Sequence, residues 1–170
     1  MSALLAQTGG VEMSRATSGV PSPKESGEAV EAEVIDRFPA LEYIPDSAAT
    51  WYDAETTTAL SPSDALPFAS VPIVATGTPI EIKSAQVRHN GGERGRFYLR
   101  EQQHRALLDA AGFYLFVVYD PRHGHPHLGR LLIPASIVDE FVPSWIEVTD
   151  RLTHAKLAWS RLLDPAEVER

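Results

Sequence analysis

The segment 77–85 constrains the fold of this chain more than any other, because it places a charged pair inside an apolar strand. A Gly-Thr-Pro turn opens the segment, and side chains then alternate between the two faces of the strand. Ile80 and Ile82 lie on one face, and Glu81 and Lys83 lie on the other. Burying a carboxylate and an amine is costly unless they are paired or bind something. The pattern therefore predicts a functional strand, in which Glu81 supplies oxygen to a divalent metal and Lys83 lies beside a water or a phosphate.

The residues after this strand predict a strand, a helix and a further strand in that order. Phe97 and Leu99 alternate with polar neighbours, as in a half-buried strand. Residues 101–111 carry an apolar stripe at helical spacing, and Gly112 ends the helix. Residues 113–119 are apolar throughout, which is typical of a strand covered on both faces. This alternation of strands and helices predicts an α/β fold.

The Glu-X-Lys tripeptide and the elements that follow it resemble the PD-(D/E)XK nuclease superfamily. The likeness covers roughly residues 60–135. The sequence around the tripeptide is similar to that of small nuclease-like proteins of halophilic archaea and their viruses. The resemblance implies a restriction-endonuclease-like α/β fold, in which a mixed central sheet is flanked by helices. It also implies a function, the hydrolysis of DNA phosphodiesters with Mg²⁺ or Mn²⁺.

The family pattern requires a second carboxylate ahead of Glu81, and two residues are candidates. Asp64 lies just before the predicted strand 68–75, although Ser63 separates it from the proline that the pattern places next to the acid. Asp53 lies further upstream. We expect Asp64 to be the second acid, while an aspartate in such a turn can also serve only to cap it.

The resemblance also assigns roles to the residues around these acids. The metal would be bound by Asp64, by Glu81 and by the backbone carbonyl of Ile82. Lys83 would position or activate the attacking water and offset charge on the phosphate. Gln103, at the start of the predicted helix, would face the site and support the metal-bound water or the phosphate.

The N-terminal part of the chain predicts a tail and a helix. Residues 1–24 are rich in Ser, Gly and Thr, which predicts a disordered tail, and residues 25–170 predict a single nuclease-like domain. Apolar residues at helical spacing predict a helix over 25–38. Three acids of this helix could add a ligand to the site or simply face solvent: Glu28, Glu31 and Glu33.

Other elements are expected around the core. Residues 68–75, with Pro72 at their centre, predict an edge strand that forms an antiparallel hairpin with the Glu-X-Lys strand. Residues 128–133 predict a strand, and residues 134–141 predict a helix. An apolar stripe predicts a last helix over 151–163.

The net charge of −8 argues against a dedicated nucleic-acid binder, which usually carries a basic excess. Acidic surfaces do, however, suit proteins that work in molar salt. The charge is also uneven, because acids gather in residues 25–64 and a basic strip follows near Glu81. This strip would meet phosphates or form an ordinary solvated face, and it consists of Lys83, Arg88, Arg94, Arg96, Arg100 and Arg105.

The composition excludes several classes of protein. The chain has no cysteine, which excludes disulfides and thiolate metal sites. No apolar run approaches the length of a membrane span, so we expect no membrane partner and a cytoplasmic location. DNA is the expected partner, and the chain could act as a monomer or a homodimer. Two alternatives stay open: a non-catalytic DNA- or protein-binding relative, and an acidic scaffold in which Glu81 and Lys83 form a structural ion pair.

Overall fold

The computed structural model describes residues 22–122 and 124–170, so most of the predicted tail lies outside the described residues. Helix α1 (Pro23–Arg37) begins two residues earlier than the predicted helix 25–38. Its start is set by a capping box, in which the Ser22 hydroxyl accepts the N–H of Glu25 and the Glu25 carboxylate accepts the N–H of Ser22. No helix of the described part is long and apolar enough to cross a membrane.

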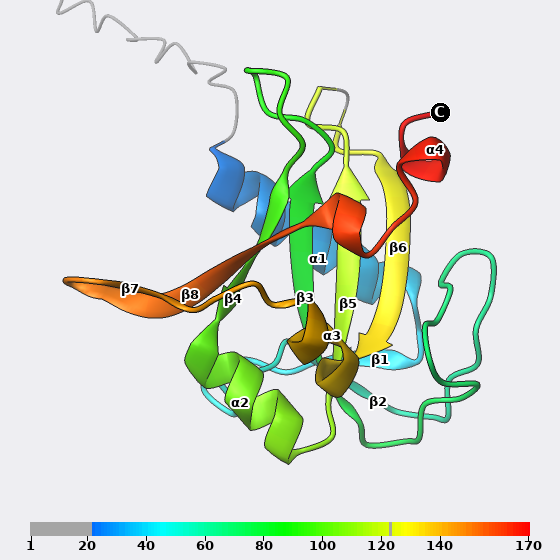
Figure 1. The fold of residues 1–170 in the computed structure, drawn as a ribbon. Helices are drawn as coiled ribbons and strands as arrows, with labels where there is room; N and C mark the ends of the chain where they lie inside the picture. Colours follow the sequence, from blue (N-terminus) through cyan, green and yellow to red (C-terminus); the bar gives the residue numbers. More distant parts are fainter. Residues whose placement is uncertain (1–21, 123) are drawn as a thin grey trace, which may run out of the picture.

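The centre of the molecule is a mixed sheet of five strands, which confirms the predicted α/β fold (Figure 1). In spatial order its strands are β1 (Leu41–Tyr43), β2 (Ala54–Thr56), β3 (Pro79–Gln86), β5 (Phe113–Tyr119) and β6 (His127–Pro134). Strand β3 carries the Glu-X-Lys residues and pairs in parallel with β5, whereas the other pairings are antiparallel. The parallel pair requires a long crossover, and that crossover contains the predicted helix, α2 (Glu101–Asp109).

The two faces of this sheet are covered by different elements (Figure 1). Val30 and Val34 of α1 pack with Ile80 and Ile82 in one core. The opposite face packs against α2, α3 (Ala135–Phe141) and a second sheet. Strand β5 is buried along its whole length between these layers, as its continuous apolar run predicts. The alternation along β3 therefore directs Glu81 and Lys83 away from the α1 face.

The second sheet has three antiparallel strands and extends from the body of the molecule (Figure 1). Its strands, in spatial order, are β4 (Arg96–Arg100), β8 (Arg151–Ala158) and β7 (Ile146–Val148). The predicted helix over 151–163 is wrong, because β8 is a strand followed by the short helices η1 (Trp159–Arg161) and α4 (Pro165–Val168). Ala155, Leu157 and Trp159 are buried at a spacing of two, and pairing with β4 satisfies this strand period.

The predicted hairpin between residues 68–75 and the Glu-X-Lys strand is also wrong. The antiparallel neighbour of β3 is β2, and residues 68–75 contain only isolated bridges, such as that between Phe68 and Leu132. Pro67 and Pro72 lack the N–H that a continuous ladder would need. Because β2 pairs with β3, Asp53, the residue directly before β2, lies beside β3.

Candidate active site

A groove opens along one edge of β3 because β2 is too short to cover it. Strand β2 pairs only with Pro79 and Ile80, so the edge of β3 beyond Ile80 faces a space between α1, β4 and the start of α2. Charged and polar side chains from each of these elements line the groove: Glu28, Glu31, Asp53, Glu81, Lys83, Arg100 and Gln103. Strand β3, α1 and α2 thus bring distant parts of the sequence to one site.

Glu81 is the most buried charged residue of this groove, with 2% of its surface exposed. Its Oε1 accepts a hydrogen bond from Nζ of Lys83 at 2.5 Å. Its Oε2 is buried, and no donor of the described residues contacts it. A buried carboxylate oxygen without a partner is costly, and a bound cation would remove that cost.

Asp53 is held next to Glu81 by the backbone of β3. Its N–H donates to the carbonyl of Ile80 at 3.0 Å, and its Oδ2 accepts the N–H of Ile82 at 2.8 Å. The N–H and C=O of one strand residue point to the same edge, so the carbonyl of Ile82 also faces the open edge of β3. The carboxylates of Asp53 and Glu81 therefore lie close together at the open edge of β3.

Burial, together with the neighbouring carboxylate of Asp53, raises the pKa of two acids in the groove. Burial raises the pKa of Glu81 to about 8, with the nearby charge of Lys83 opposing the rise and that of Asp53 adding to it. Burial also raises the pKa of Glu31 to about 7, and Asp53 again adds to the rise. The groove thus favours the uptake of a proton or a cation.

This donor set fits a hard divalent cation. Mg²⁺ is commonly bound by one or two carboxylates while it keeps several waters, and Mn²⁺ accepts the same oxygen ligands. Asp53, Glu81 and the carbonyl of Ile82 are oxygen donors of this kind. Within residues 22–122 and 124–170, no three His, Cys, Asp or Glu residues gather as a metal cluster, so an all-side-chain cage is absent there. These residues fit an open metal site, in which water or substrate would provide the remaining ligands.

Gln103 lies in the groove, where its interactions connect the site to the neighbouring loop. Its Nε2 donates to the carbonyl of Thr50 at 3.0 Å, and its Oε1 accepts a hydrogen bond from Nζ of Lys83 at 3.4 Å. Lys83 is therefore held between Glu81 and Gln103. His104, the next residue, is buried and bonded to Tyr114 and Asp139, away from this contact.

The structure does not bring Asp64 to Glu81. Asp64 is exposed in a turn and lines a separate hollow with His127 and Asp164. Asp53, the alternative second acid, interacts with Glu81 instead. The expectation for Asp64 followed from placing the strand 68–75 beside β3, and β2 takes that place. The one signal for Asp53 in the sequence is its position directly before a short strand.

Of the acids predicted on the first helix, two face the groove and one does not. Glu28 and Glu31 line the groove. Glu33 lies 3.4 Å from Nε2 of His127 on the other side of α1. Burial raises the pKa of Glu31, and the charges of Asp53 and Lys83 act on it as well, so Glu31 is electrostatically coupled to the site.

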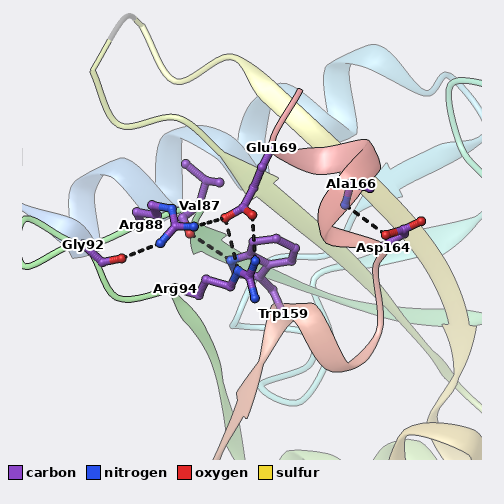
Figure 2. Close-up of polar contacts among 8 residues, drawn as sticks. All are labelled: Val87, Arg88, Gly92, Arg94, Trp159, Asp164, Ala166 and Glu169. Carbon is purple, nitrogen blue, oxygen red and sulfur yellow. Dashed lines mark hydrogen bonds and ion pairs between the residues drawn. The ribbon is translucent and has the colours of Figure 1, made fainter.

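The basic strip is divided by local ion pairs. Arg88 and Arg94 both bind the carboxylate of Glu169 at 2.8 Å, and Arg94 also lies over the ring of Trp159 (Figure 2). Arg105 binds Glu101 on α2. Arg88, Arg94 and Arg105 therefore form ion pairs within the protein. Arg96 and Arg100 of the strip lie on the exposed face of β4.

A family model described as a PD-(D/E)XK nuclease superfamily domain matches residues 17–164. No match is found among curated proteins or among solved structures. The matched range includes the groove and both sheets, and the mixed sheet flanked by helices is consistent with the restriction-endonuclease-like fold. The chain belongs to the PD-(D/E)XK nuclease superfamily.

Proposed function

We propose that this protein hydrolyses phosphodiester bonds in DNA and that the reaction depends on Mg²⁺ or Mn²⁺. The observation that carries the proposal is the convergence of Asp53 and Glu81 beside Lys83 in an open groove. Asp53, Glu81 and the carbonyl of Ile82 would hold the metal. Asp53 replaces Asp64 in this assignment because only Asp53 lies beside Glu81.

The chemistry divides between the metal and the residues of the chain. When bound, the metal would lower the pKa of a water and stabilise charge on the phosphate. Lys83 would orient the attacking water and offset the phosphate charge from its place beside Glu81. Gln103 would keep the Lys83 ammonium in position through the contact at 3.4 Å. Arg100, on the rim of the groove, would attract the phosphate.

The hydrogen bond between Lys83 and Glu81 also supports a second candidate, a structural ion pair in a relative without activity. Three features favour catalysis over this alternative. Oε2 of Glu81 has no donor among the described residues, a second carboxylate lies beside it, and the pair opens onto a groove. A purely structural pair would instead satisfy both carboxylate oxygens.

Cleavage of plasmid, single-stranded and branched DNA in Mg²⁺ or Mn²⁺ tests the proposal. The wild-type protein should cut at least one of these substrates, and chelation by EDTA should stop the reaction. Glu81→Ala should lose both activity and Mn²⁺ binding measured by calorimetry. Failure of the wild-type protein to cut any substrate, or equal Mn²⁺ binding by Glu81→Ala, would contradict the proposal.

A further inference from the structure

The outer face of the second sheet carries cations that no described acid neutralises. The cross-strand register pairs Tyr98 with Lys156 and Arg100 with His154, so these side chains share one face. Arg96 lies two residues before Tyr98 and joins the same face. Phe97 and Leu99, which alternate with these residues, are fully buried on the inner face.

The three cations of this face are Arg96, Arg100 and Lys156. All three are exposed, and within residues 22–122 and 124–170 no ion pair or hydrogen bond is made by any of their side chains. The acid nearest in sequence, Glu101, is occupied by Arg105. The chain as a whole is acidic, with a net charge of −8, so this cationic face differs in sign from the protein's overall charge. Such a face suits an anionic partner.

Tyr98 adds a stacking surface in the middle of these cations. Its ring stacks on that of His154, with centroids 4.5 Å apart and planes at 17°. His154 is buried and holds the tyrosine ring from one side, while 41% of Tyr98 stays exposed. A fixed, exposed aromatic ring flanked by cations is the arrangement by which proteins stack single-stranded bases and neutralise the adjacent phosphates.

The face leads directly into the candidate active site. Tyr98 and Arg100 line the same groove as Glu81 and Lys83. Strand β4 therefore lies beside the groove, and it pairs with β8, whose far end projects from the body together with β7 (Figure 1). A strand of DNA lying on this face would have its end or its junction near the two carboxylates.

We propose that the outer face of β4–β8–β7 binds a single-stranded segment of the DNA substrate. A base stacks on Tyr98, and Arg96, Arg100 and Lys156 contact the phosphates. This inference rests on the proposed function and adds the form of the substrate, because the protein would then act on single strands or on branched DNA with a single-stranded arm. A duplex would not offer an unstacked base to Tyr98.

Binding of fluorescein-labelled oligo(dT) to the full chain in EDTA tests the inference without requiring catalysis. Fluorescence anisotropy should show tighter binding of the single strand than of a duplex of the same length. Tyr98→Ala should weaken single-strand binding about tenfold with the salt dependence unchanged, and Tyr98→Phe should restore it. Arg96→Ala and Lys156→Ala should each reduce the slope of log K against log salt by about 0.7.

Arg122→Ala is the matched control, because Arg122 is an exposed arginine bound to Asp120 in a loop outside this sheet. It should leave affinity and slope unchanged. Single-strand binding that survives Tyr98→Ala and Lys156→Ala would overturn the inference, and so would a preference for duplex. If the wild-type protein cleaves DNA while these variants bind normally, only the docking face is wrong and the proposed function stands.

A second copy of the chain is the competing occupant, because Ile146, Val148 and Leu152 are exposed on the same projecting sheet. Sedimentation of the wild-type protein and of Leu152→Ser distinguishes the two. A monomer in both cases agrees with the inference. A wild-type dimer that dissociates in Leu152→Ser would show that a partner chain covers the face, and would overturn it.

Discussion

The carboxylate of Asp53 and the backbone N–H of Ile82 are joined by a hydrogen bond of 2.8 Å, although 28 residues separate them in the chain. This bond fixes a loop acid against the open edge of β3. It places the Asp53 carboxylate beside Glu81, where the negative charge of Asp53 contributes to the raised pKa of Glu81. The second acid of the site is therefore positioned by the backbone of the strand that carries the first.

Asp53→Asn is expected to reduce DNA cleavage by at least about 100-fold, because it removes a charge from the metal site. The amide oxygen of asparagine still accepts the N–H of Ile82, so the melting temperature should change little. Asp64→Asn is the matched control and should retain cleavage within about twofold of the wild type, because substitutions away from a site have small effects. Activity that is lost with Asp64 and kept without Asp53 would contradict the assignment.

Lys83→Ala is expected to abolish cleavage while Mn²⁺ binding persists, since Lys83 is proposed to act on the water and the phosphate. Breaking one side of a fully buried ion pair costs about 3–5 kcal/mol of stability. Here the loss should stay below about 2 kcal/mol, because the pKa of Glu81 is raised to about 8, so its carboxyl is mostly protonated near pH 7 and little buried charge is left when Lys83 is removed. Urea denaturation near pH 7 measures the free energy of unfolding. A loss of about 3–5 kcal/mol in the free energy of unfolding would instead support a structural ion pair between Lys83 and Glu81.

The stability of the metal-free protein should fall as the pH rises from about 4.5 to about 8. The pKa of Glu81 is raised from 4.5 to about 8 in the folded state, so folding favours its protonated form. That contribution is fully present below pH 4.5 and is lost as Glu81 ionises. Glu31, with its pKa raised to about 7, acts in the same direction.

Melting temperatures across this pH range, with and without Mn²⁺, measure the effect. Glu81→Gln should flatten the profile, because glutamine does not titrate. Added Mn²⁺ should stabilise the wild-type protein more at pH 8 than at pH 6, since metal ligands must be deprotonated. A wild-type profile that rises between pH 5 and pH 8 in EDTA would contradict this assignment of Glu81.

Gly95→Ala is expected to destabilise the fold by about 1–3 kcal/mol or more, as overpacking in a core does. A Cβ at Gly95 would lie 2.0 Å from the backbone carbonyl oxygen of Gln86, where the chain enters β4 beside β3. Gly91→Ala is the matched control in the same connection, because a Cβ there meets no atom within 4 Å. Thermal unfolding of the two variants gives the comparison, and equal melting temperatures would show that β3 and β4 are less closely packed.

The acidic composition predicts that molar KCl raises the melting temperature. A net charge of −8 generates repulsion across the surface, and about 1 M salt screens charges beyond about 3 Å. The ion pairs of Arg88 and Arg94 with Glu169 should weaken under the same conditions, but exposed pairs contribute only about 0–1 kcal/mol each. A lower melting temperature in molar KCl than in dilute buffer would contradict this prediction.

The sequence by itself determined the parts of this protein that depend on local pattern. The alternation in residues 79–86 and the apolar run of residues 113–119 predicted β3 and β5. The crossover helix α2 and the placement of Glu81 on the face opposite Ile80 and Ile82 followed from the same periodicities. The family resemblance rested on these residues, and the family match confirms it.

Only the tertiary structure decided which segments lie beside β3 and β4. Residues 151–158 have apolar positions that suit either a helix or a strand, and pairing with β4 selects the strand. Asp53 and Asp64 are both aspartates near short extended segments, and no local pattern distinguishes them. The distinction depends on non-local pairing, in which β2 rather than residues 68–75 supplies the backbone partner of β3, and this brings the Asp53 carboxylate to Ile82 and Glu81.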